Sequence, residues 1–412
     1  MPRRVVNLGQ EQLGVIPHFD HSTSFPQQLV PTKRKAAQAV QGETKGQNAK
    51  RKSKAKDEED NSDERDDSDP FAGKKFSLVC TDGAERHFAV ERTIYQADGI
   101  IGRGSSVFLV DCEAEDDRQS ESRVAPSSSW EGKKFVVKFS FPSETRDPED
   151  ALVNHARNIA KGEFFNKRKK SYEVRVLRIT ISEELCSLND LKTPEEAAQV
   201  FYDILQVHRW LYTEANILHR DLSMGNIMFR RVGGKVYGVL NDFDLSSFLP
   251  LRDEPSSQWR TGTRPYMACD LLMKGWCGGP LYRHDLESLF YIMLILCCHY
   301  KSPDRALPFK DWPYRNWFTS DDATVATNKG YFITWTQSAF PLQSRFERFR
   351  KWLDAIYRCF SVGYSHRHHQ WMLGDPINNE EQETLAGHVT YAKLDELMRS
   401  FDGTNLHRRW AS

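Results

Sequence analysis

The stretch His-Arg-Asp-Leu-Ser-Met-Gly-Asn occupies residues 219–226, near the middle of a chain of 412 residues. A second polar stretch, Asn-Asp-Phe-Asp, follows at residues 241–244. Each is preceded by an apolar run, at 215–218 and at 236–240. Because the second run, rich in β-branched and aromatic residues, is typical of a strand, we expect it to deliver its polar stretch to a loop at the strand end.

The residue types in these two loops suit phosphoryl transfer. Moving a γ-phosphoryl group requires positioning and neutralisation of negative charge more than covalent work by the protein. We expect Asp221 to orient the acceptor hydroxyl and accept its proton, and Asn226 to turn back from the same loop to a metal ion. Asp242 is expected to bind the magnesium that bridges the phosphates. Either tripeptide alone is an ordinary charged turn, but the ordered pair indicates a catalytic site.

The composition of the whole chain limits the class of protein. Basic and acidic residues balance at 57 each, so the charge predicts no nucleic-acid or membrane partner. The longest apolar stretch, 289–298, is about half the length that crosses a bilayer, so we expect a buried helix. No apolar leader follows the first residues, and the eight cysteines form no Cys-x-x-Cys pair. We therefore expect an intracellular protein with reduced thiols.

Residues 1–70 have the composition of a disordered tail. Pro, Gln, Ser, Lys and Asp dominate the segment, which therefore cannot bury enough apolar surface to offset its ordering entropy. Its basic clusters, Lys33–Lys35 and Lys50–Lys56, fit a bipartite nuclear address and a solvated linker equally well. The expected location is accordingly nuclear or cytoplasmic.

Residues 71–185 have the pattern of a small β-rich domain. Gly102 and Gly104 lie between two strand-like runs, where backbone amides can approach phosphate oxygens. Lys138 lies within the apolar strand predicted at 135–139, and a lysine there needs partners for its ammonium group. The expected partners are phosphates and a helix carboxylate, for which Glu149 is favoured over two competitors, Glu144 and Glu163.

The remaining residues, 186–412, predict a larger helical domain. We expect a hinge at 182–186 and helices at 194–212, 346–360 and 394–401. His208 is expected to be a packed helix residue, and the histidines at 366, 368 and 369 to lie in a polar loop. Asp285 opens the most apolar helix, so its carboxylate should accept hydrogen bonds from backbone amides of the 219–226 loop.

Taken in order, these motifs resemble the protein-kinase superfamily and, more narrowly, the fungal-type protein kinase family. The likeness covers roughly residues 76–400. It implies an α+β bilobal fold with a disordered tail at 1–70, a small β-rich N-lobe at 71–185 and a larger helical C-lobe at 186–412. The narrower likeness is carried by Ile-Gly-Arg-Gly-Ser (101–105), Val-Lys-Phe-Ser-Phe-Pro-Ser (137–143), Leu-His-Arg-Asp-Leu-Ser-Met-Gly-Asn-Ile (218–227), Asn-Asp-Phe-Asp-Leu (241–245), Arg-Thr-Gly-Thr-Arg-Pro-Tyr-Met-Ala (260–268) and His-Asp-Leu-Glu-Ser-Leu-Phe-Tyr (284–291).

The resemblance also implies roles for individual residues. Asp221 would be the catalytic acid/base, and Thr263 would hydrogen-bond to it, as in Ser/Thr kinases. Arg220 would suit a phosphorylated residue of the segment after Asp242. The other implied roles are phosphate binding by Lys138 with Glu149 as its partner, metal binding by Asn226 and Asp242, bracing of the loop by Asp285, and a nucleotide-binding loop with Gly102, Gly104 and, where a third glycine is usual, Val107.

The implied activity is transfer of the γ-phosphoryl group of ATP, with Mg²⁺, to Ser/Thr hydroxyls of protein substrates. The sequence leaves the oligomeric state open. Ser223, Asp244 and the pair at 269–270 depart from ordinary protein kinases, and the first two fit the fungal-type pattern. Two alternatives stay open: a kinase-like binding module, because the third glycine is absent, and a small-molecule kinase, because of Ser223 and Asp244.

Overall fold

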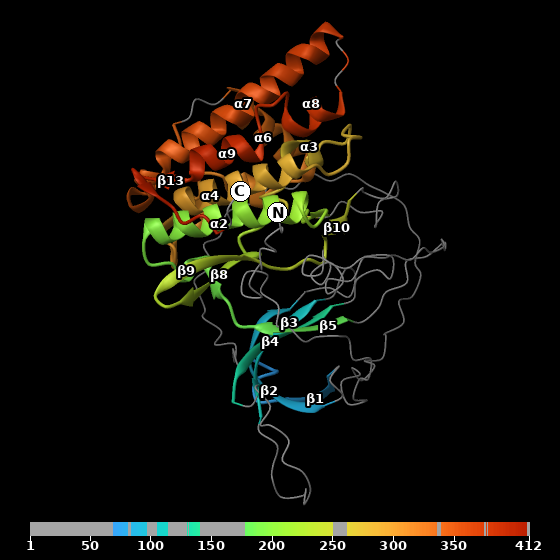
Figure 1. The fold of residues 1–412 in the computed structure, drawn as a ribbon, viewed down its shortest axis with the longest axis vertical. Helices are drawn as coiled ribbons and strands as arrows, with labels where there is room; N and C mark the ends of the chain where they lie inside the picture. The colour runs from blue at the N-terminus through green and yellow to red at the C-terminus, as the bar shows by residue number, and fades with distance from the viewer. Residues whose placement is uncertain are drawn as a thin grey trace, which may run out of the picture.

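The structure is a computed structural model in which a β-rich N-terminal part is followed by a helical C-terminal part, which confirms the predicted α+β class (Figure 1). Figure 1 places strands β1 to β5 at one end of the molecule and most helices at the other, with β8 and β9 between them. Predictions for residues 1–68, the Gly102–Gly104 loop and Glu149 lie outside the described residues. The structure describes residues 69–80, 84–96, 105–113, 130, 132–140, 178–249, 262–335, 339–374, 376 and 378–409.

The N-terminal part is one antiparallel sheet with the strand order β1-β2-β3-β4-β5. Alternate residues such as Phe135 and Val137 are buried in its own apolar core, as expected for a sheet with one covered face. Val107 is opposite Lys138 in the register of β3 and β4, so the two are cross-strand neighbours. The strands are β1 (Lys75–Val79), β2 (Glu85–Gln96), β3 (Ser106–Cys112), β4 (Lys134–Ser140) and β5 (Arg178–Glu183).

Two small sheets hold the two polar loops together. The 219–226 loop runs from β7 to β8, and residues 241–246 run from β9 to β10. Because β7 pairs with β10 and β8 pairs with β9, both ends of one loop are tied to both ends of the other. The sheets are formed by β6 (Cys186–Ser187), β8 (Ile227–Val232) and β9 (Lys235–Leu240), and by β7 (Ile217–Leu218) and β10 (Ser247–Phe248).

Helix α2 (Pro194–Thr213) packs against β9 and positions this sheet. The helix begins after Thr193, whose hydroxyl accepts a hydrogen bond from the amide of Glu196. Gly238 of β9 lies so close to α2 that an added Cβ would be 2.7 Å from the carbonyl oxygen of Val200. Only glycine permits this approach, which sets the distance between the helix and the strand that leads into residues 241–244.

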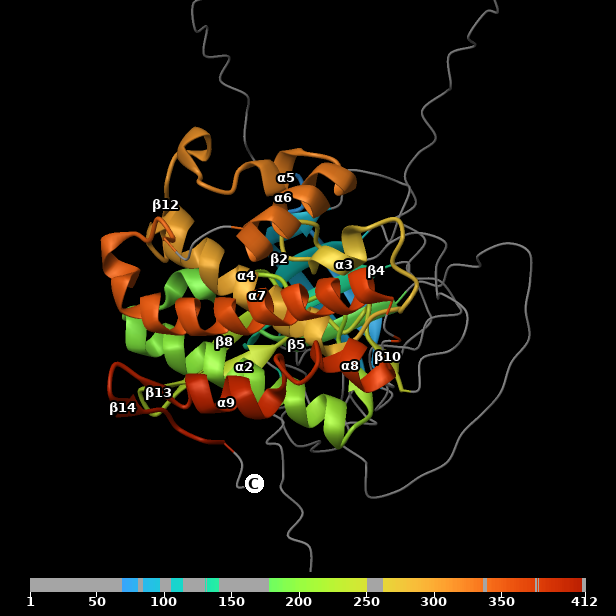
Figure 2. The ribbon, with the colours of Figure 1, turned by 90° about the horizontal axis from the view of Figure 1, so that it is seen from above.

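Helix α4 (Tyr282–His299) is the centre of the C-terminal core. All of its residues are buried, which confirms the predicted buried helix. Among the described residues, no helix is long and apolar enough to cross a membrane. Figure 2 shows α7 crossing over α4, with α2 and α9 on one side and α5 and α6 on the other. The remaining helices are α3 (Cys269–Leu272), α5 (Asn316–Thr319), α6 (Asp322–Trp335), α7 (Arg350–Leu373), α8 (Asn379–Thr384) and α9 (Tyr391–Met398), and short strands pair as β11 (Tyr300–Ser302) with β12 (Arg305–Ala306) and β13 (Ser400–Phe401) with β14 (Thr404–Asn405).

Several predicted element bounds are wrong. The hinge expected at 182–186 is shorter, because β5 continues to Glu183 and β6 begins at Cys186. The helix expected at 346–360 begins at Arg350 and continues to Leu373, where Gly374 ends it with φ 72°. The histidines at 366, 368 and 369, expected in a loop, therefore lie on α7.

Candidate active site

Asp221 is held in place by residues from two segments. Its carboxylate is buried, with 7% of the residue exposed. Thr263 donates to Oδ1 through both its backbone N–H, at 2.9 Å, and its hydroxyl, at 3.0 Å. Nδ2 of Asn226 donates to the carbonyl oxygen of Asp221 at 2.8 Å and lies 3.4 Å from Oδ2. The structure thus brings the predicted residues at 221, 226 and 263 together, with one carboxylate oxygen of Asp221 bound by Thr263.

Asp285 of α4 accepts a hydrogen bond from the backbone of the 219–226 loop, as the sequence predicts. Oδ2 of Asp285 accepts from the backbone N–H of Arg220 at 2.9 Å and lies 2.8 Å from Nε2 of His208. Burial would raise the pKa of Asp285, but the hydrogen bonds from His208 and Arg220 hold it below its ordinary value. Arg220 has φ 71°, a conformation uncommon for a bulky residue, so this brace stabilises a strained point of the loop.

His208 is a packed residue of α2, which confirms the sequence interpretation. Its Nδ1 lies 2.7 Å from the hydroxyl of Tyr391 while Nε2 faces Asp285. The neighbouring His219 is fully buried, and its Nε2 lies 3.1 Å from the carbonyl oxygen of Asn241. Burial lowers the pKa of His219, so the imidazole is neutral and joins the two loops through a hydrogen bond.

Lys138 meets two carboxylates of the second loop. Its Nζ lies 2.8 Å from Oδ1 of Asp242 and 2.8 Å from Oδ2 of Asp244. The Asp244 side chain is 1% exposed and that of Lys138 15%, so the carboxylate is buried and its charge depends on the nearby lysine. A strand of the five-stranded sheet and a loop of the helical part therefore converge at one ion-paired cluster.

The contact with Asp244 was not predicted from the sequence. The expected partner of Lys138 was a helix carboxylate, Glu149 or a competitor, and all three candidates lie outside the described residues. One feature of the sequence could have indicated this contact: Asp244 lies two residues after Asp242, in the loop that follows β9. The left-handed φ of 60° falls on Asp242, and the amide of Asp244 donates to Oδ1 of Asp242 at 3.3 Å. Position 244 itself needs no positive φ, which explains why an aspartate is accommodated there.

The donor atoms at this cluster fit a magnesium ion. Mg²⁺ prefers carboxylate and amide oxygens together with phosphate oxygens and water. Asp242 offers a carboxylate that is 27% exposed, and the amide N–H of Asn241 donates to the carbonyl oxygen of Asn226 at 2.9 Å, so the two predicted ligand loops are adjacent. Within the described residues, no three His, Cys, Asp or Glu side chains form a metal cluster. A phosphoryl-transfer site does not need one, because the phosphates complete the coordination.

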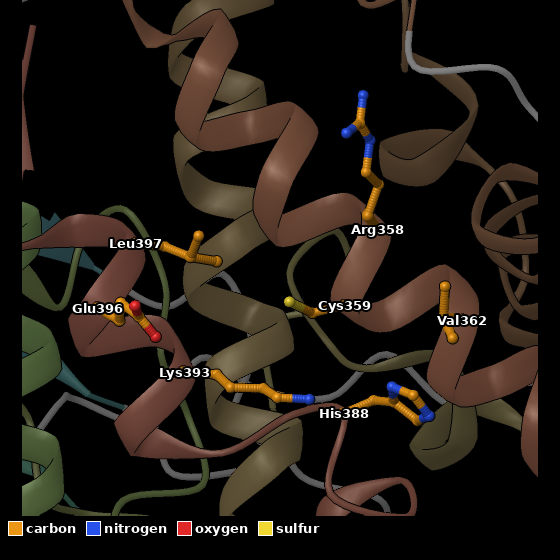
Figure 3. Close-up of a pocket in the computed structure, with 7 residues that line it drawn as sticks. All are labelled: Arg358, Cys359, Val362, His388, Lys393, Glu396 and Leu397. Carbon is orange, nitrogen blue, oxygen red and sulfur yellow. The ribbon is translucent and has the colours of Figure 1, made fainter.

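A groove elsewhere in the C-terminal part contains none of these residues. It has a volume of about 340 Å³ and lies between α7 and α9, where Figure 3 shows Cys359 of α7, Lys393 of α9 and His388 beside it. Its lining has no carboxylate pair and no amide near a carboxylate, so it does not have the groups for phosphoryl transfer. The candidate active site is therefore the cluster at Lys138, Asp221 and Asp242.

Comparison with known proteins supports this location. The family described as fungal protein kinase matches residues 156–297, a range that includes both loops and most of α4. Among curated proteins none matches the chain. Among solved structures, the kinase PK-1 of the Cydia pomonella granulovirus is 13% identical, with 75% of this chain and 92% of that chain covered and a TM-score of 0.39. A structural likeness of that degree carries no inference about the site. The chain is thus similar to the fungal protein kinase family over a range that contains both loops of the site.

Proposed function

We propose that the protein is an ATP- and Mg²⁺-dependent protein kinase that phosphorylates serine and threonine hydroxyls. Its similarity to the fungal protein kinase family over residues 156–297 supports a phosphotransferase in general. The observation that carries the proposal is the contact between Lys138 and Asp242. Nζ of Lys138 in β4 lies 2.8 Å from Oδ1 of Asp242, which is in the loop between β9 and β10. A lysine and an acid in contact, next to a loop with a base and an amide, are the groups that phosphoryl transfer requires.

Each residue has a task that its surroundings support. Asp221 accepts the proton of the acceptor hydroxyl through Oδ2, because Oδ1 is occupied by two hydrogen bonds from Thr263. Lys138 binds phosphate oxygens while Asp244 remains its counter-ion. When bound, Mg²⁺ would neutralise the charge on the phosphates, and Asp242 and Asn226 would be the residues that hold it. Thr263 at Asp221 supports serine and threonine as acceptors, since this contact is the one that the resemblance associates with Ser/Thr kinases.

Replacement of the proposed base tests the activity directly. Asp221→Asn keeps the size of the side chain but cannot accept the proton, so turnover should fall by about 10²–10⁴-fold, the range for loss of a positioned base. The measurement is transfer of ³²P from labelled ATP, with Mg²⁺, to generic protein substrates and to the protein itself. Asp311→Asn, at an exposed residue far from the cluster in sequence, is the matched control and should keep wild-type turnover.

Two results would contradict the proposal. The first is that wild-type protein transfers no ³²P to any protein and behaves like Asp221→Asn, which would contradict a protein kinase activity. If Mg·ATP then still raised the melting temperature of wild type but not of Asp242→Asn, a binding module would be favoured. Label found in small molecules and in no protein would favour a small-molecule kinase.

A further inference from the structure

Helix α6 carries a lysine on its buried face. The buried residues of this helix are Val325, Ala326, Lys329, Phe332 and Ile333, which follow the spacing of a single apolar stripe. Lys329 lies in the middle of the stripe and is 0% exposed. Removing an ammonium group from water costs several kcal/mol unless it is compensated, and an apolar residue at such a position is commonly as stable or more stable. The lysine therefore needs a reason other than packing.

The compensation comes from two carbonyl groups and two aromatic rings. Nζ of Lys329 donates to the carbonyl oxygen of Met267 and lies 3.5 Å from that of Arg264. The same atom is 4.1 Å from the centre of the Tyr291 ring and 5.0 Å from that of Trp317, within range of cation–π attraction. Burial lowers the pKa of Lys329 to about 7, although the nearby Glu287 favours the charged form.

Both carbonyl groups belong to the turn formed by residues Thr263–Met267. In this turn, the amides of Tyr266 and Met267 donate to the carbonyl oxygen of Thr263 at 2.9 Å and 3.2 Å. Thr263 in turn donates to Asp221 twice. An unbroken series of contacts thus runs from α6 through the Thr263–Met267 turn to the proposed catalytic base. The turn therefore lies directly beside Asp221.

We propose that Lys329 is a positioning residue that fixes the Thr263–Met267 turn beside Asp221 as the surface on which the protein acceptor lies. The inference rests on the proposed function, because it assigns the acceptor side of the same site. The chain ties the turn to α6 a second time at the protein surface, where Nε of Arg264 lies 2.8 Å from Oδ1 of Asp322. These two side chains are 45% and 43% exposed, so this ion pair should contribute little. Asp322, at the start of α6, therefore supplies a matched control, because it contacts the same turn through Arg264.

The test compares Lys329→Met with Asp322→Asn in the full-length chain. Methionine retains the length and apolar stem of lysine without the donors, so the fold should persist. Hydrogen exchange at the amides of Tyr266 and Met267 should become at least tenfold faster in Lys329→Met, with exchange in α4 unchanged. The KM for the protein acceptor should rise at least fivefold while the KM for Mg·ATP stays within twofold. In Asp322→Asn, every value should stay within twofold of wild type.

The exchange measurement decides the inference even if the wild-type protein transfers no phosphate. Exchange at Tyr266 and Met267 within twofold of wild type in Lys329→Met would overturn the role of Lys329, whatever the activity. Absence of wild-type transfer together with fast exchange would instead contradict the proposed function and leave the positioning of the turn intact. Lys329→Gln, which keeps one donor, is the second variant. Loss of the whole fold in both variants would also overturn the inference, since Lys329 would then be a general structural residue.

Discussion

Asp244 is the residue at which this chain differs most clearly, within its second loop, from ordinary protein kinases. Glycine is usual at this place, and the side chain that replaces it makes an ion pair with Lys138 at 2.8 Å. Since the side chain is 1% exposed, its charge has little contact with water and depends on the lysine. We infer that Asp244 restrains Lys138 from the side of the second loop, beside the more exposed Asp242, which is the proposed metal ligand.

Removal of the Asp244 charge should weaken nucleotide binding. Asp244→Asn retains the shape but removes the negative charge that lies 2.8 Å from Nζ of Lys138. Because Lys138 is then less firmly held, kcat/KM for Mg·ATP should fall roughly 10–100-fold, which corresponds to about 1.4–2.8 kcal/mol. Asp244→Gly should lose at least as much, because position 244 has no positive φ for a glycine to relieve. Steady-state kinetics at varied Mg·ATP are the measurement. An increase of kcat/KM in either variant would show instead that Asp244 competes with the phosphates for Lys138.

Asp270 joins three helices through its buried carboxylate. It lies in α3 and accepts from Nη2 of Arg283 in α4 at 2.7 Å, and from both terminal nitrogens of Arg367 in α7 at 2.6 Å. Burial opposes its ionisation, but the two arginines and His284 hold the pKa of Asp270 below its ordinary value. Cys269 and Asp270 stand where ordinary protein kinases have Pro-Glu, but position 270 is still an acid. Its carboxylate ties α3, which follows the Thr263–Met267 turn, to the helical core.

Neutralisation of Asp270 should be costly for stability. Asp270→Asn leaves the fully buried Arg283 and the mostly buried Arg367 without their carboxylate, and breaking a buried pair in this way costs about 3–5 kcal/mol. The free energy of unfolding in urea measures the effect. Glu195→Gln is the control, since its partner Arg348 and Glu195 itself are 43% and 51% exposed, and its cost should be below about 1 kcal/mol. Equal, small losses in the two variants would contradict the assignment.

Elements with a local signal could be predicted, whereas contacts between distant elements could not. The polar loops at 219–226 and 241–244 follow apolar runs, so their place at strand ends was readable from neighbouring residues. The burial of Lys329 depends on carbonyl groups in a segment far away in the sequence, and a lysine alone predicts exposure. The pairing of Lys138 with Asp244 likewise depends on how β4 of the five-stranded sheet lies against the loop that follows β9. The histidines at 366, 368 and 369 were expected in a polar loop, but a helix already formed at Arg350 continues past them until Gly374 ends it.

In the part of the chain that the structure describes, His219, His284 and His299 are buried histidines with a lowered pKa, and their imidazoles are neutral. His219 lies in the 219–226 loop, and His284 and His299 lie near the two ends of α4. Burial lowers the pKa of all three, to about 4 for His284 and for His299. For His284 the nearby Arg283 lowers it further, whereas Asp270 and Asp285 oppose the shift. All three side chains are 0–1% exposed, so protonation cannot be accommodated by water without opening the fold.

Acid should therefore destabilise the protein well above the pH at which carboxylates titrate. An unfolded histidine has a pKa near 6.5, so between pH 6.5 and 4 the unfolded chain binds protons that the folded chain does not. For His284 and His299 the stabilisation is complete above pH 6.5 and is lost as the pH falls towards 4, by about 1.4 kcal/mol per pH unit for each of the two. Urea unfolding at pH 7.5, 6.5 and 5.0 measures the slope.

In His299→Gln the slope between pH 6.5 and 5.0 should be smaller by about that amount, whereas His369→Gln, at an exposed position of α7, should leave it unchanged. Unfolding free energies that do not change between pH 6.5 and 5.0 in wild type would mean that the buried histidines become protonated without loss of the fold.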